Sequence, residues 1–94
     1  MKIGEIVKSG KGTIIDVRTA VEFREGHVAG SVNIPLHEIE DRLEEIKGLQ
    51  QPLVLCCMSG NRSGQACYFL SSEPITCYNG GSWFELDYIQ KQEA

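Results

Sequence analysis

The sequence predicts an α/β fold with a small central parallel sheet of about four to five strands and helices on both faces. Two observations support this fold class. Short runs of apolar, often β-branched residues, such as TIIDV at 13–17 and LVLCC at 53–57, alternate with segments of helical spacing. Glycines, prolines and cap residues separate these segments. In such a sheet the strands end at one edge, which is where ligands bind.

The first half of the chain is expected to supply two strands and three helical segments. Thr19 followed by Glu22 is a capping-box pattern that starts a helix, and Gly26 closes it. Pro35 ends a short strand, and Gly48 stops a helix that carries apolar residues at helical spacing. The expected elements are a helical turn at 3–8, a strand at 13–17, a helix at 20–25, a strand at 31–34 and a helix through 39–46.

The second half contains the strongest apolar run. LVLCC at 53–57 is predicted as a central strand, and the helix at 62–71 follows it after a short loop. A last short strand is expected at 75–78, with Gly80 and Gly81 as a turn. Ser82 with Glu85 then predicts the cap of a final helix that runs to about residue 91.

The composition is that of one ordinary globular domain. The chain has 94 residues, of which 41% are hydrophobic and 23% charged. Its net charge of −4 argues against a general affinity for nucleic acid or anionic membrane. The sequence contains no apolar run long enough to span a bilayer, and its first 30 residues lack a signal-peptide pattern. With Met1 present, we expect a cytoplasmic protein that is a monomer or weak dimer.

The cysteine pattern favours free thiols. Adjacent cysteines make an awkward disulfide framework, and no C-x-x-C motif occurs. His27 and His37 lie far from the cysteines in the sequence, so no zinc site is expected. The four cysteines are Cys56, Cys57, Cys67 and Cys77.

The stretch CCMSGNRS at 56–63 is the strongest candidate for chemistry. It leads from a strand into a helix start, where unpaired backbone N–H groups and the helix dipole form an anion site. A cysteine that faces this site has its thiolate stabilised, which makes it a better nucleophile at neutral pH. Gly60 and Asn61 tolerate the backbone angles of a tight loop, and Arg62 supplies either a fixed charge for a donor or an ion pair that holds the loop.

The two adjacent cysteines predict different chemistries. Counted from Cys56, the stretch reads C-x5-R followed by Ser63, the spacing of cysteine phosphatases and similar arsenate reductases. Counted from Cys57, the loop is one residue tighter, which suits a single extra sulfur atom better than a tetrahedral phosphate. Because successive strand residues face opposite ways, only one of the pair should face the loop.

Cys57 to Ser63 resembles the active loop of the rhodanese-like sulfurtransferases, in which a cysteine and two variable residues precede Gly-Asn-Arg-Ser. Four further elements are similar to family motifs in the same order. They are Asp16-Val17-Arg18, Glu22-Phe23, the segment GHVAGSVNIP at 26–35, and Gly80-Gly81 with Trp83. The resemblance implies a rhodanese-like fold and a single rhodanese domain over residues 1–94.

The resemblance also implies a mechanism. Cys57 would take a sulfane sulfur from thiosulfate, a polysulfide or a persulfide, and pass it to a thiol, cyanide or a protein cysteine, without metal or cofactor. The active loop would comprise Met58, Ser59, Gly60, Asn61 and Arg62, with support from Asp16, Arg18 and Ser63. Met58 stands where many thiosulfate-using members have Arg or Lys, so this loop is less positive. The two alternatives are a phosphatase or arsenate reductase that uses Cys56, and a rhodanese-like binding or regulatory module without turnover.

Overall fold

The computed structural model describes residues 3–92, so the ends of the predicted 1–94 unit, Met1 included, lie outside the described residues. Four strands form one sheet in the order β2–β1–β3–β4, and every neighbouring pair is parallel. The strands are β1 (Thr13–Asp16), β2 (Val32–Asn33), β3 (Leu53–Cys57) and β4 (Cys77–Ser82). This sheet confirms the predicted α/β class and parallel topology.

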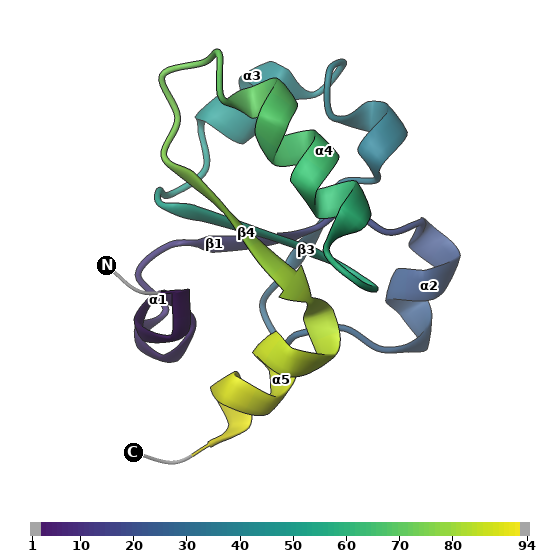
Figure 1. Ribbon diagram of the computed structural model, residues 1–94, viewed down its shortest axis with the longest axis vertical. Coiled ribbons are helices and arrows are strands. Elements are labelled where there is room, and N and C mark those ends of the chain that lie inside the picture. Colours follow the sequence, from purple (N-terminus) through teal and green to yellow (C-terminus); the bar gives the residue numbers. More distant parts are fainter. Residues whose placement is uncertain (1–2, 93–94) are drawn as a thin grey trace.

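Helices cover both faces of the sheet, as predicted. Helices α3 and α4 lie on one face, α1 and α5 on the other, and α2 lies near the edge where β3 ends (Figure 1). None of these described helices is long and apolar enough to cross a membrane. The elements are α1 (Ile3–Ser9), α2 (Ala20–Glu25), the 3-10 helix η1 (Leu36–Glu38), α3 (Leu43–Lys47), α4 (Asn61–Leu70) and α5 (Trp83–Lys91).

Strand β3 separates two apolar clusters and is buried along its whole length. Side chains of a strand alternate between the faces of the sheet. Leu55 and Cys57 therefore pack in the cluster under α4, with Ala66 and Leu70. The second cluster lies towards α1 and α5 and contains Ile6, Val7, Val28, Val54, Cys56 and Leu86. The two adjacent cysteines thus belong to opposite faces.

The prediction for the last strand was wrong at its end. The sequence predicted a strand at 75–78 and a turn at Gly80 and Gly81, but β4 continues through both glycines to Ser82. Leu55 pairs with Asn79 and Cys56 with Gly81, so Gly80 is the extra residue of a bulge. A Cβ at Gly80 would stand 2.7 Å from the Val54 side chain. Gly80 is required for close packing within the strand, whereas the sequence alone predicted a turn at this glycine.

The helix predicted through 39–46 is also interrupted. The chain forms η1 at 36–38 and then α3 at 43–47, and residues between them are turn. Arg42 bridges this break with ion pairs to Glu38 at 3.0 Å and Glu45 at 2.9 Å. Ile39 and Ile46 are nevertheless both buried. The helical spacing therefore predicted correctly that Ile39 and Ile46 face the core, although the two residues do not belong to one helix.

Candidate active site

Cys57 ends β3, and its sulfur lies beneath the first turn of α4. The Gly60 N–H group donates a hydrogen bond to the Cys57 Sγ atom over 3.0 Å. The Ser63 hydroxyl oxygen, in the first turn of α4, is 3.5 Å from the same sulfur. Cys57 is only 1% exposed. A sulfur at the start of a ten-residue helix, facing its free N–H groups, occupies a site suited to an anion.

The tight loop between β3 and α4 requires glycine at position 60. Gly60 is the N-cap residue of α4 and has a φ of 98°, a left-handed conformation that glycine adopts without strain. A Cβ atom there would stand 3.2 Å from the Cα atom of Gly81. The close approach of the loop to β4 and the aim of the Gly60 N–H group therefore both depend on this glycine.

The pKa values of the two adjacent thiols are displaced in opposite directions. Burial opposes ionisation of Cys57, but hydrogen bonds from the Ser63 hydroxyl and from the N–H groups of Ser63, Gly60 and Ser59 outweigh it, so the pKa of Cys57 lies below its ordinary value. Burial, reinforced by the charge of Asp16, raises the pKa of the Cys56 thiol. Cys57 is the thiol that ionises more readily.

Asn79, on β4, completes the polar environment of this sulfur and was missed in the sequence. Its Oδ1 atom is 2.7 Å from the Ser63 hydroxyl, and its Nδ2 atom donates to the Gly60 carbonyl over 3.0 Å. The single Ser63 proton can therefore point to Asn79 when Cys57 is a thiol, and to the sulfur when Cys57 is a thiolate. The available signal was a polar residue directly after the strand that the sequence predicted at 75–78.

Arg62 forms an ion pair that holds the loop to α2. Its two terminal nitrogens donate to the Glu22 carboxylate over 2.7 and 3.0 Å. The hydrogen bond from Arg62, with a second one from the Thr19 backbone, lowers the pKa of Glu22 to about 2. The sequence left open whether Arg62 binds a donor or forms an ion pair that holds the loop, and the structure shows the ion pair. Its partner, Glu22, was recognised in the sequence as a helix-capping residue and as part of a family motif, but not as a partner of Arg62.

Asp16 and Arg18 form a buried pair at the end of β1. Arg18 donates from Nε to both carboxylate oxygens, and from Nη2 to Oδ2 over 2.6 Å. It also donates to the Gly26 carbonyl over 2.7 Å and lies 4.6 Å from the centre of the Trp83 ring. Among the described residues, no hydrogen bond joins this pair to the Cys57 sulfur. The two residues organise the rim of the site without touching the thiol.

The surface beside Cys57 is formed by the exposed part of the loop. Ser59 is exposed, and Asn61 is the exposed first residue of α4. Met58 is 55% exposed and borders a hollow of about 200 Å³ with Gly26 and Trp83. The charged residues around this hollow are Arg18, Glu22 and Glu25. Arg18 is the basic residue of this lining, and it is already paired with Asp16. The hollow therefore offers no free positive charge.

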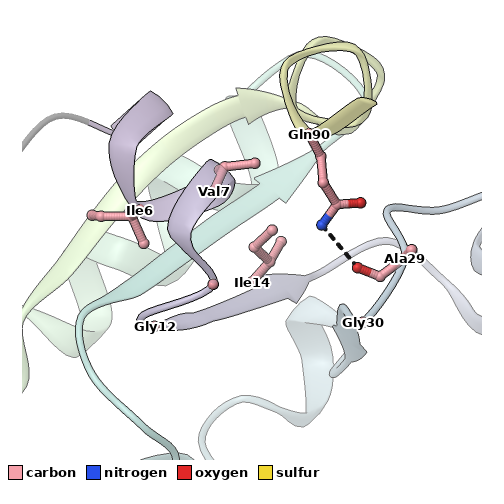
Figure 2. A pocket seen from close by; sticks show the side chains of 8 residues that line it. Ile6, Val7, Gly12, Ile14, Ala29, Gly30 and Gln90 are labelled. Carbon is pink, nitrogen blue, oxygen red and sulfur yellow. Dashed lines mark hydrogen bonds between the residues drawn. The ribbon is translucent and has the colours of Figure 1, made fainter. Parts of the chain in front are cut away.

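A second hollow of about 200 Å³ lies on the face of the sheet opposite to Cys57. Figure 2 shows Ile6 and Val7 of α1, Ile14 of β1 and Gln90 of α5 around it. The Gln90 amide donates to the Ala29 carbonyl over 3.0 Å. The residues that line this hollow include neither a nucleophile nor a titratable side chain.

The fold agrees with the comparisons to known proteins. The family model described as Rhodanese-like domain matches residues 3–83. This chain belongs to the rhodanese-like family. Among solved structures, reduced Bacillus anthracis CoADR-RHD covers 94% of this chain with a TM-score of 0.77 and 35% identity, while the match spans 15% of that protein. A rhodanese-related protein from Thermoplasma volcanium covers 92% of the chain and shares the fold, with a TM-score of 0.76.

Curated rhodanese-like relatives match most of the chain but only part of their own length. The "Uncharacterized protein YqhL" of Bacillus subtilis (strain 168) is 39% identical over 66 residues, which is 70% of this chain and 52% of that protein. The "Thiosulfate sulfurtransferase PspE" of Escherichia coli (strain K12) is 36% identical over 63 residues, which is 66% of this chain and 61% of that protein. The chain therefore spans roughly half to three fifths of these two relatives.

Proposed function

We propose that this chain is a sulfurtransferase that carries a sulfane sulfur as a persulfide on Cys57. One observation carries the proposal. The Cys57 sulfur accepts the Gly60 N–H group at the start of α4, in an environment that lowers the pKa of its thiol. Relatives named thiosulfate sulfurtransferase, at 28–36% identity, support the same class of reaction.

The transfer proceeds in two balanced steps. The Cys57 thiolate attacks the outer sulfur of the donor, a new S–S bond forms, and the donor's own bond to that sulfur breaks. With thiosulfate, sulfite leaves with the electron pair. An acceptor such as cyanide or a thiolate then attacks the outer sulfur of the persulfide, and Cys57 departs as a thiolate. The N–H groups of residues 58–62 stabilise the negative sulfur in both steps.

The charges around the loop favour a donor of low charge. Arg62 is paired with Glu22, and Arg18 with Asp16, so neither guanidinium offers its full charge to a dianion. Met58 adds an apolar, exposed side chain next to Cys57. We therefore expect thiol persulfides, whose reacting sulfur group carries at most one negative charge, to donate sulfur more efficiently than thiosulfate.

Peptide masses after exposure to sulfur donors test the proposal. The reduced protein is incubated with thiosulfate or polysulfide, alkylated and cut with trypsin, which releases residues 48–62 with both Cys56 and Cys57. We expect this peptide to gain one sulfur atom that cyanide removes. The gain should be absent in Cys57→Ser and present in Cys56→Ser, which is the matched control.

The other outcomes separate the alternatives. Phosphate-ester cleavage that is lost in Cys56→Ser, without any sulfur gain, would mean that the neighbouring thiol is the nucleophile. No sulfur gain and no ester cleavage would leave the binding module as the better description. The burial of Cys56 and its raised pKa argue against the first of these results.

A further inference from the structure

A second pair of cysteines lies outside the active loop. The Sγ atoms of Cys67 and Cys77 are 3.1 Å apart, and both residues are half-buried free thiols. Cys67 comes from the middle of α4, and Cys77 is the first residue of β4. The sequence showed only that the two residues lie on different elements. The fold brings them into direct contact.

This contact belongs to a seam between α4 and β4. Ser63 and Cys67 are one helical turn apart, so they lie on the same face of α4. Cys77 and Asn79 are two residues apart, so they lie on the same face of β4. Ser63 contacts Asn79 over 2.7 Å, and Cys67 contacts Cys77 over 3.1 Å. The thiol pair is thus the second contact of this seam. The first contact, between Ser63 and Asn79, supports the Cys57 sulfur.

We propose that Cys67 and Cys77 are an oxidisable dithiol that closes to an intramolecular disulfide, a modification site separate from Cys57. A disulfide needs its sulfur atoms at about 2.05 Å, so closure asks for a movement of about 1 Å. Side-chain rotation on two packed elements can supply this movement. The inference stands on the seam alone and does not depend on the proposed sulfur transfer.

The two thiols share one hydrogen bond, which lowers the pKa of Cys67 in spite of burial and, together with burial, raises the pKa of Cys77. Either sulfur can react first, because the two atoms are in direct contact. With a peroxide as oxidant, one thiolate attacks an oxygen, the O–O bond breaks, and a sulfenic acid and hydroxide form. The second sulfur of the pair then attacks the sulfenic sulfur, the S–O bond breaks, and water leaves with the thiol proton.

Cys57 lies at the other end of β3 from Cys77. On β4, Cys77 is paired with Leu53, while Cys57 is paired with Ser82 at the opposite end of β3. Four residues of strand separate these positions along β3, which is about 13 Å. The dithiol can therefore be oxidised while the Cys57 thiol stays free, and the disulfide would fasten α4 to β4 below the active loop.

Peptide mapping after mild oxidation tests the inference. The chain has no Lys or Arg from 63 to 90, so trypsin places Cys67 and Cys77 together in residues 63–91 and the other two cysteines in 48–62. After one equivalent of hydrogen peroxide and alkylation, we expect peptide 63–91 to lack both alkyl groups and two hydrogen atoms. Chymotrypsin, which cuts after Tyr68 and Phe69, should yield two fragments joined until a reductant is added.

Matched variants sharpen the result. Cys57→Ser should still form the disulfide, whereas Cys67→Ser and Cys77→Ser should not. The oxidised wild-type protein should melt at a higher temperature than the reduced protein, and Cys67→Ser should show no such rise. Peptide 63–91 that keeps two alkylated thiols while Cys57 is oxidised would overturn the inference. So would a link between peptides 48–62 and 63–91.

Discussion

Cys56 and Cys57 are adjacent residues of one type whose surroundings differ because a strand alternates its side chains. Cys56 is enclosed by apolar residues under α1 and α5, and burial raises the pKa of its thiol. Cys57 faces the start of α4, where N–H groups and the Ser63 hydroxyl lower its pKa. The alternation of side chains along a strand predicted that the two residues face opposite sides of the sheet. It did not predict which of these sides carries the start of α4.

The Ser63 hydroxyl should control the ionisation of Cys57. In Ser63→Ala the thiolate loses one hydrogen-bond donor, so the pKa of Cys57 rises and less thiolate is present at pH 7. We expect alkylation of Cys57 at pH 7 to slow by about threefold to tenfold. At a pH above both pKa values the rates should converge, because both proteins are then fully ionised.

The measurement is the pH dependence of iodoacetamide labelling on peptide 48–62. Ser71→Ala is the matched control, since Ser71 caps the far end of α4 and its hydroxyl donates to the Tyr68 carbonyl. An unchanged labelling midpoint in Ser63→Ala would mean that the backbone N–H groups alone hold the thiolate.

Met58 should determine how well an anionic donor is used. A lysine at this exposed position adds a positive charge beside the loop, where both nearby arginines are already paired. We expect Met58→Lys to raise kcat/KM for thiosulfate by about threefold to tenfold, and this gain should shrink at high salt. Transfer from a neutral donor should change little.

The control for Met58→Lys is Tyr68→Lys. Tyr68 is 84% exposed on a later turn of α4, so this variant gives the same net charge at another place. Steady-state kinetics with thiosulfate compare the two variants. An equal gain in both would assign the effect to the overall charge of the molecule, and the position of Met58 would then have no special role.

The loop between β3 and α4 is the element whose geometry depends most on one residue. Gly60 adopts a φ of 98°, and a side chain there would meet Gly81 at 3.2 Å. We expect Gly60→Ala to lower the free energy of unfolding by about 1–3 kcal/mol and to reduce sulfur transfer. Denaturant unfolding and persulfide formation on peptide 48–62 measure the two effects.

Gly4 offers a matched comparison in α1. A Cβ at Gly4 would meet no atom within 4 Å, and alanine is the better helix former by up to about 1 kcal/mol. Gly4→Ala should therefore be neutral or stabilising. If Gly60→Ala were equally harmless, the left-handed turn could not be what aims the Gly60 N–H group at Cys57.

Elements defined by local signals could be predicted from the sequence. The capping box of Thr19 and Glu22 is present as expected, and the strand at 53–57 has the predicted bounds. Features that depend on distant segments could not be predicted. Glycine is needed at position 80 because the Val54 side chain comes close to it. Glu22 forms its ion pair with Arg62, which lies 40 residues away. Asn79 was missed for the same reason.

At the scale of the molecule, the Asp16–Arg18 pair joins segments that are far apart in the chain. It lies at the end of β1, and Arg18 reaches the Gly26 carbonyl after α2 and the Trp83 ring at the start of α5. Asn33 on β2 donates to the carbonyls of Asp16 and Arg18 over 3.0 and 2.9 Å. The sequence suggested only a supporting role. The structure shows that the pair connects the sheet to both a helix end and the rim of the site.

Removal of the Asp16 charge should therefore destabilise the whole fold. Asp16 is 0% and Arg18 2% exposed, so Asp16→Asn leaves a buried guanidinium without its counter-charge. Such a loss typically costs about 3–5 kcal/mol, a large part of the roughly 5–15 kcal/mol that stabilises a small domain. Urea unfolding followed by circular dichroism measures it. Asp41→Asn, at an exposed turn, should change stability by no more than about 0.5 kcal/mol. A similarly small loss in Asp16→Asn would mean that the Gly26 carbonyl and the Trp83 ring suffice to hold the Arg18 charge.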